Sequence, residues 1–264
     1  MSFPSESKPD FERLRDEIGK GARVVSLSGL TSIASRAFVL AKLQTETRKT
    51  FVVVTDSNKE LENWECDLDF WKNTSRKQTD STISSLPSME SDVYAGVSPH
   101  AETLEKRALT LWNLSSGAPD FLVTSIKSLI TRTVSPAEMR ELGAVLRRDE
   151  DFAPETLLEK LISAGYVREE PIKNVGEFSV RGGIVDVWSP AAENPVRIEF
   201  FGDTVDSIRE FDAETQLSTN QLKEISIAPM REFAATAQDF RDWARFAREK
   251  FADERFSRNL LDRT

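Results

Sequence analysis

The stretch from Glu177 to Gln216 decides the fold of this chain and reads EFSVRGGIVDVWSPAAENPVRIEFFGDTVDSIREFDAETQ. Apolar and polar residues alternate over three short runs, and Gly, Pro and Asp separate the runs. This pattern is typical of antiparallel strands with one face in water, because successive side chains of a strand point to opposite faces. Two arginines and an aromatic residue, Arg181, Arg197 and Phe201, lie on or beside these strands. The stretch therefore indicates a protein-docking surface and not a catalytic pocket.

The spacing within one run predicts which side chains share a face. Arg197 and Phe201 are four residues apart, and an even spacing places both on the same face of a strand. Arginine offers a planar set of donors to carboxylates, and a phenylalanine can fill an apolar pocket. Purely structural roles are equally open: bonds from Arg181 to loop carbonyls, ion pairs of Arg197, and a place for Phe201 at the edge of the core. We expect nearby carboxylates to orient the arginines or to add charge at the rim, and these are Glu177, Asp186, Glu199 and Asp203.

The composition is that of an ordinary globular protein. The chain has 264 residues, of which 39% are hydrophobic and 30% charged, enough for one large or two medium domains. The net charge of -9 argues against broad binding to DNA, because such proteins carry a basic stripe. One cysteine and one histidine cannot form a disulfide or a zinc site, which fits a reducing cytoplasm. We expect Cys66 to pack as a small hydrophobe, and no run is long enough to span a membrane.

Strand-like and helix-like segments alternate over residues 1–134. The expected strands are Arg23–Leu27, Phe51–Val54, Ile83–Leu86 and Phe121–Thr124. The expected helices are Phe11–Gly19, Ser32–Leu43, Asn58–Trp71, Glu102–Leu114 and Ser125–Thr131. This order predicts an α/β domain in which helices cover a parallel sheet.

The pattern changes at residue 135, and residues 135–232 predict an α+β domain built on an antiparallel sheet. The expected helices are Pro136–Arg140 and Pro154–Ala164. The expected strands are Ala144–Leu146, the runs of the opening stretch and Gln221–Ile227. Residues 233–264 return to a helical pattern, which we interpret as the start of a further segment that goes back to the first domain.

A phosphate-binding loop would lie between the first expected strand and its helix, at Gly29–Arg36. A working loop reads G-x-x-x-x-G-K-[ST], in which the lysine binds the outer phosphates and the hydroxyl residue holds magnesium. Here Ala34, Ser35 and Arg36 replace the second glycine, the lysine and the hydroxyl residue, and only Gly29 is kept. We interpret the segment as a degenerate, RecA-like phosphate loop. It is either a weak anion site at a helix N-terminus or, as we favour, a junction without a ligand.

The opening stretch resembles the second domain shared by the excision-repair helicase UvrB and the transcription-repair coupling factor family, Mfd. The matching positions include Gly176-Glu177-Phe178, Val180-Arg181-Gly182, Asp186, Pro190, the run from Pro195 to Asp203, Ile208, Phe211-Asp212 and Thr215-Gln216. Two departures resemble the coupling factors rather than UvrB. Ser35 replaces the loop lysine, and the segment Asp92–His100 leaves no room for the tyrosine-rich β-hairpin of UvrB. The resemblance covers about Val24 to Phe233.

The resemblance implies an N-terminal, UvrB-like module whose second domain binds UvrA through Arg181, Arg197 and Phe201. It implies recruitment of UvrA to stalled transcription complexes for nucleotide excision repair. It also implies no catalytic residue, metal or cofactor in this part, since ATP, magnesium, RNA polymerase and DNA would be bound by other domains of intact family members. The alternatives are a UvrB-type ATP-dependent helicase fragment and a damaged-DNA binder. Nucleotide binding would favour the first, and salt-dependent DNA binding the second.

Overall fold

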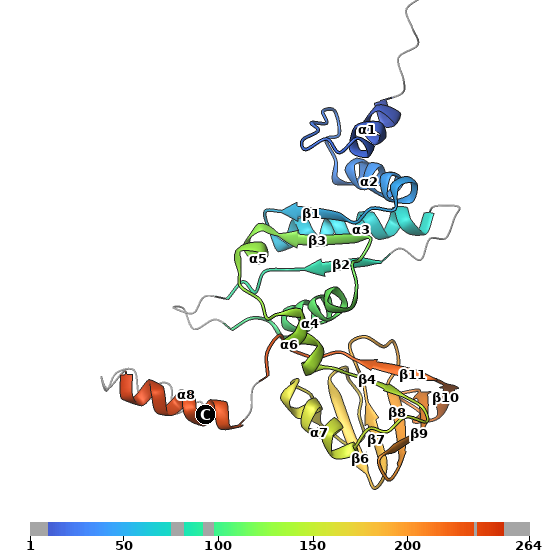
Figure 1. The fold of residues 1–264 in the computed structure, drawn as a ribbon, viewed down its shortest axis with the longest axis vertical. Helices are drawn as coiled ribbons and strands as arrows, with labels where there is room; N and C mark the ends of the chain where they lie inside the picture. The colour runs from blue at the N-terminus through green and yellow to red at the C-terminus, as the bar shows by residue number, and fades with distance from the viewer. Residues whose placement is uncertain (1–9, 75–81, 92–97, 235–236, 251–264) are drawn as a thin grey trace, which may run out of the picture. The chain divides into compact units, whose positions relative to one another are not determined.

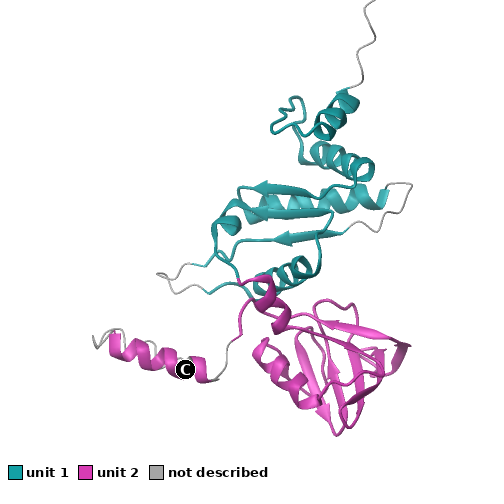
Figure 2. Ribbon diagram, viewed as in Figure 1, with its two compact units in different colours: residues 1–133 teal, residues 134–264 magenta. Residues whose placement is uncertain are grey.

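A computed structural model describes residues 10–74, 82–91, 98–234 and 237–250. The chain divides into two compact units, residues 1–133 and 134–264, which are coloured teal and magenta in Figure 2.

The first unit is built on a three-stranded parallel sheet in the order β1-β3-β2 (Figure 1). The strands are β1 Phe51–Thr55, β2 Ile83–Leu86 and β3 Phe121–Ser125. The helices are α1 Asp10–Gly19, α2 Ile33–Thr47, α3 Asn58–Thr74, α4 Ala101–Ser116 and α5 Ile126–Ile130. The mixed α/β class and the parallel sheet predicted from the alternating segments are therefore confirmed.

The apolar stripe of α3 forms the centre of this unit. Leu61, Trp64 and Leu68 are buried on one side of the helix and pack with Val53 of β1 and Val123 of β3. Residues three and four apart lie on the same helical face, which is why the sequence pattern predicted this stripe. Cys66 lies off the stripe and is exposed, so its predicted packing in the core is wrong.

The expected strand at Arg23–Leu27 is wrong. This segment has no strand, and Val24 and Leu27 are 85% and 54% exposed. A short apolar run becomes a strand only when a neighbour completes its hydrogen bonds, and β1 is the edge of the described sheet. The run has apolar residues but no ladder partner among the described residues, and the sequence alone could not reveal that.

The second unit contains a six-stranded sheet in the order β10-β9-β8-β7-β6-β5 and a two-stranded antiparallel sheet, β11-β4. The large sheet consists of β5 Val167–Arg168, β6 Glu177–Arg181, β7 Ile184–Val187, β8 Val196–Phe201, β9 Thr204–Phe211 and β10 Ser218–Gln221. The small sheet pairs β4 Ala144–Arg147 with β11 Glu224–Ile227. The helices are α6 Pro136–Leu142, α7 Pro154–Ser163 and α8 Ala237–Lys250. The predicted closing strand Gln221–Ile227 includes the last residue of β10 and the whole of β11, which belong to different sheets.

One face of the six-stranded sheet, the inner face, carries the core of this unit. Val185, Ile198 and Ile208 are fully buried there, and they pack with Leu157 and Leu161 of α7 and with residues of β4 and β11. Pro154 at the first turn of α7 and Gly165 after its end, with φ at +96°, fix the limits of this helix. The opposite face of the sheet, the outer face, therefore receives the residues that alternate with this core.

Two tight turns set the register of the strands. Arg181 pairs with Ile184 around Gly182-Gly183, and Phe201 pairs with Thr204 around Gly202-Asp203. The first glycine of each turn has φ near +60°, a conformation that two-residue hairpins need and that glycine adopts without strain. Further along, β9 contains one extra residue between Val205 and Ser207, so the pairing shifts there.

The last described element, α8, carries Trp243 and Phe246, each about half exposed. The return of residues 233–264 to the first domain stays a prediction. Within the described ranges, none of the helices combines the length and the apolar composition that crossing a membrane requires.

Candidate protein-binding surface

The outer face of the six-stranded sheet brings the predicted arginines together. Register pairs Ser179, Asp186, Arg197 and Arg209 across four adjacent strands, β6 to β9. The next row joins Arg181, Ile184, Glu199 and Ser207. Paired residues of neighbouring strands point to the same face, so these side chains share one surface. We call it the arginine face and define it by Arg181, Asp186, Arg197, Glu199, Phe201 and Arg209.

Asp186 lies at the centre of this face and holds both predicted arginines. The Nε of Arg197 donates to Asp186 Oδ1 at 2.7 Å, and its Nη2 donates to Oδ2 at 2.9 Å. Nη2 of Arg181 donates to the same Oδ2 at 2.6 Å. The side chain of Asp186 is only 2% exposed. A buried carboxylate needs such partners, because an unpaired charge away from water is strongly destabilising.

Arg197 is the more enclosed of the two arginines. Its side chain is 17% exposed, against 47% for Arg181. The guanidinium group lies 4.8 Å from the ring centroid of Phe211, which is fully buried at the outer face. The hydrogen bonds to Asp186 raise the pKa of Arg197 above its ordinary value, with partial burial opposing the rise. Arg197 is therefore a fixed charge with a fixed orientation.

Phe201 is the last residue of β8 before the turn and is 85% exposed. Ile198 and Phe200 of the same strand pack on the inner core, so Phe201 and Arg197 fall on the outer face. The strand pairing thus agrees with the prediction that Arg197 and Phe201 share a face. At about 3.3 Å per residue, the two Cα atoms are roughly 13 Å apart along the strand. A solvent-exposed aromatic ring on the same face as fixed arginines is an arrangement typical of binding anchors.

The other carboxylates predicted at the rim have separate partners. Glu199 forms an ion pair with Arg209 and accepts a hydrogen bond from the Ser207 hydroxyl at 2.8 Å. Asp203 lies exposed in the turn after Phe201. Glu177 instead closes the loop before β6, and its carboxylate accepts hydrogen bonds from Lys173 and Asn174. Burial raises the pKa of Glu177, but these hydrogen bonds outweigh it, so the net shift is downward.

Sequence reasoning missed Arg209 and gave Asp186 only a flanking role. Val205 and Ile208 are both buried although they are three residues apart, which breaks simple alternation along β9. The bulge explains this, because its extra residue shifts the alternation along β9 so that Arg209 lies opposite Arg197 on the outer face. An odd spacing between two apolar residues in a strand was the available signal. The importance of Asp186 depends on cross-strand register, which no local pattern reveals.

The predicted degenerate, RecA-like phosphate loop is not confirmed. No strand lies in residues 20–28 between α1 and Gly29, whose φ is +88°, and Ser32 caps α2 by accepting a hydrogen bond from the Ser35 amide. The hydroxyl of Ser35 donates to the Ser32 carbonyl, and Nε of Arg36 donates to the Leu30 carbonyl. Ala34 is partly buried within α2. These polar groups therefore form hydrogen bonds around the N-terminus of α2. The predicted absence of a hairpin at Asp92–His100 falls largely outside the described residues.

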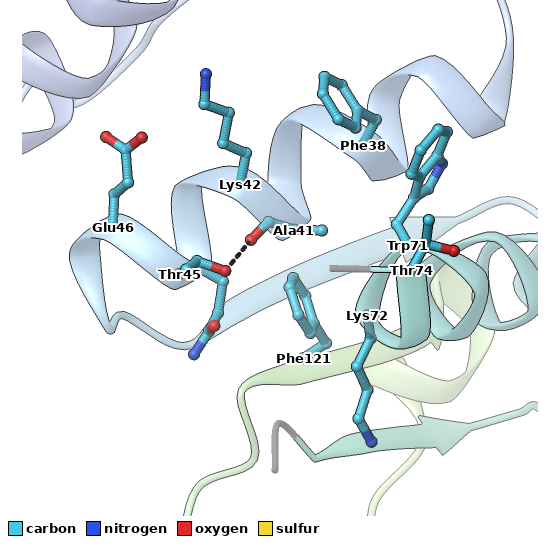
Figure 3. A pocket seen from close by; sticks show the side chains of 10 residues that line it. Phe38, Ala41, Lys42, Thr45, Glu46, Trp71, Lys72, Thr74 and Phe121 are labelled. Carbon is cyan, nitrogen blue, oxygen red and sulfur yellow. Dashed lines mark hydrogen bonds between the residues drawn. The ribbon is translucent and has the colours of Figure 1, made fainter. Parts of the chain in front are cut away.

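A separate hollow of about 360 Å³ opens in the first unit (Figure 3). Phe38 and Trp71, in edge-to-face contact at 4.9 Å, line it together with Phe121. Phe121 begins β3, so the hollow lies at the amino end of that strand, whereas open α/β sheets bind ligands at the carboxyl ends. Among the described residues, no group of three or more His, Cys, Asp or Glu side chains could hold a metal.

Comparison with known proteins places the arginine face within a defined family region. The family described as UvrB interaction domain matches residues 145–233. The transcription-repair-coupling factor of Myxococcus xanthus is 35% identical over 227 residues, which are 86% of this chain and 19% of that protein. The corresponding factor of Bacillus subtilis is 32% identical over 235 residues, 88% of this chain and 19% of the relative. That of Staphylococcus haemolyticus is 29% identical over 229 residues, 86% and 18% respectively.

The chain thus spans about a fifth of the length of these relatives. The matches confirm the resemblance on both levels, the second unit by its domain family and most of the chain by its relatives. The chain is therefore an N-terminal, UvrB-like module of the transcription-repair-coupling factor family, with a UvrB interaction domain at residues 145–233.

Proposed function

We propose that this chain recruits UvrA, the damage-recognition ATPase, to stalled transcription complexes for nucleotide excision repair. The observation that carries the proposal is the arginine face, which lies wholly within the matched UvrB interaction domain. There, a buried carboxylate holds Arg181 and Arg197 on the same sheet face as the exposed ring of Phe201. Such a surface suits a protein partner better than a small substrate.

The free donors of this face define the chemistry of the partner. Nη1 of Arg181 and Nη1 of Arg197 make no hydrogen bond within the part of the chain that the structure describes. Charge-assisted bonds to carboxylates are the strongest that these donors can form. We therefore expect UvrA to present acidic side chains to the arginines and an apolar pocket to Phe201.

The recruiting role needs no ATP hydrolysis by this chain. The segment Gly29–Arg36 lacks the lysine of a phosphate loop, and its Ser35 and Arg36 bond to nearby backbone. We propose that ATP and magnesium, RNA polymerase and DNA are bound by other domains of the coupling factors, and that the module works in the cytoplasm. The relatives are longer than this chain, which leaves room for such domains.

A calorimetric titration of UvrA with the chain and its variants tests the proposal. We expect Phe201→Ala and Arg181→Ala each to weaken binding by about 10- to 30-fold, as truncation of an interface anchor costs about 1.4 to 2 kcal/mol. Arg197→Ala is a poorer probe, because it removes two of the three arginine hydrogen bonds to the buried Asp186 carboxylate, whereas Arg181→Ala removes one, and it would destabilise the fold more.

Matched controls are available elsewhere in the same unit. Ile162 on α7 is 60% exposed and provides an apolar control for Phe201. The side chain of Arg147 on β4 is 53% exposed and ion-paired with Glu224 at 3.0 Å, which resembles the state of Arg181. Ile162→Ala and Arg147→Ala should bind like the parent chain. Equal binding by Phe201→Ala and Arg181→Ala would show that UvrA docks elsewhere.

A further inference from the structure

We propose that Asp186 is a positioning residue for partner binding, because it holds the guanidinium groups of Arg181 and Arg197 in the orientation that UvrA recognises. This inference rests on the proposed function and extends it to a residue that does not itself reach the partner. At 2% exposure, the Asp186 carboxylate is covered, while the arginines that it holds are partly open to solvent.

The geometry separates Asp186 from an ordinary surface ion pair. Arg197 grips the carboxylate through two parallel hydrogen bonds of 2.7 and 2.9 Å, which fix the plane of the guanidinium group. The ring of Phe211 limits movement of the same group from another side. Asp186 accepts from Nε–H and from one of the two Nη2–H groups of Arg197, so the two Nη1–H groups and the second Nη2–H remain as donors for a partner, and their directions are fixed. A side chain that is ordered before binding loses less entropy on binding.

The sign of the charge makes the proposal testable. Asp186 is a negative group within a surface that is proposed to meet carboxylates, so its charge by itself repels the partner. If only net charge mattered, Asp186→Asn would strengthen binding to UvrA. If Asp186 positions the arginines, the same change weakens binding, since the freed guanidinium groups sample several orientations. The two explanations therefore predict opposite outcomes from one substitution.

Glu224 provides a matched control outside the arginine face. It is a carboxylate of β11 whose side chain is 61% exposed, and it pairs with Arg147 at 3.0 Å. Glu224→Gln removes the same charge as Asp186→Asn but leaves Arg181 and Arg197 with their partner. We expect Glu224→Gln to bind UvrA as well as the parent chain, and Asp186→Asn to bind at least tenfold more weakly.

Arg197→Lys covers the case in which Asp186→Asn fails to fold, as circular dichroism would show. Lysine keeps the positive charge but cannot form the two parallel bonds, so we expect a similar loss of at least tenfold. Binding of Arg197→Lys or of folded Asp186→Asn at parent strength would overturn the proposal.

Nuclear magnetic resonance of the free chain distinguishes failure of this inference from failure of the proposed function. Nitrogen-15 relaxation should show rigid Nε–Hε groups for Arg181 and Arg197 in the parent chain and in Glu224→Gln. In Asp186→Asn, both groups should become mobile. Unchanged mobility would overturn the positioning role whether or not UvrA binds, whereas rigid arginines in a chain that does not bind UvrA would reject the proposed function alone.

Discussion

Two residues of one strand should separate stability from binding. Ile198 and Phe201 both lie on β8, yet Ile198 is fully buried in the inner core and Phe201 is 85% exposed at the turn. Replacement of a buried isoleucine by alanine removes packed methyl groups and leaves a cavity, which costs about 2–5 kcal/mol. The exposed side chain of Phe201 buries only about 30 Å² of its surface. At about 25 cal/mol/Å², this burial stabilises the fold by less than about 1 kcal/mol.

These free energies convert into different melting temperatures. For a unit of this size, 1 kcal/mol corresponds to about 4 °C. We therefore expect Ile198→Ala to lower the melting temperature of the second unit by about 8–20 °C and Phe201→Ala by less than about 4 °C. Thermal unfolding followed by circular dichroism measures both changes, and calorimetric titration with UvrA at a temperature where both variants are folded measures binding.

The pattern across the two assays is the decisive result. Phe201→Ala should bind UvrA about 10- to 30-fold more weakly while staying stable, and Ile198→Ala should lose stability while its folded form binds normally. A large fall in stability for Phe201→Ala together with a small one for Ile198→Ala would mean that the faces of β8 are assigned the wrong way round. Strand register would then not account for which side chains of β8 reach a partner.

Three further predictions concern other parts of the chain. The pKa of Glu177 is lower in the folded state than its unfolded value of about 4.3, so the ionised carboxylate stabilises the fold above that pH. This stabilisation is lost as the pH falls through the lower, folded pKa. Glu177→Gln should therefore make the melting temperature fall less steeply as the pH is lowered into the acid range. Gly176→Ala should lower the free energy of unfolding by about 1–2 kcal/mol, because Gly176 has φ at +83° and an added Cβ would lie 2.6 Å from Met230 Cε. Gly117 has an extended backbone and open space around it, so Gly117→Ala should leave the free energy of unfolding unchanged. Urea unfolding measures both. Millimolar ATP with magnesium should leave thermal unfolding unchanged, and a clear rise in melting temperature would show that the Gly29–Arg36 segment binds nucleotide after all.

Local patterns predicted most helices and strands of both units. The stripe Leu61, Trp64 and Leu68 and the alternation Val196, Ile198 and Phe200 repeat at the periods of a helix and of a strand. The same alternation predicted that Arg197 and Phe201 share a face. The resemblance at residues 177–216 supplied the family, which the comparisons confirm.

Contacts between distant residues were beyond such patterns. Val24 and Leu27 look like a strand from composition, but among the described residues no neighbouring strand pairs with them, and they are exposed. The segment Gln221–Ile227 looks like one strand, yet the chain leaves the six-stranded sheet after Gln221 and joins β4 from Glu224. In both cases the outcome depends on hydrogen bonds across the fold and not on the residues themselves.

The sequence by itself determined the periodic elements, the face of β8 that carries Arg197 and Phe201, and the family of the chain. Only the tertiary structure decided that Asp186 is the buried partner of both arginines and that Arg209 lies opposite Arg197. The physical reason is register: a shift of one residue between neighbouring strands would exchange every facing side chain, and register is set by turns, by a bulge and by core packing together.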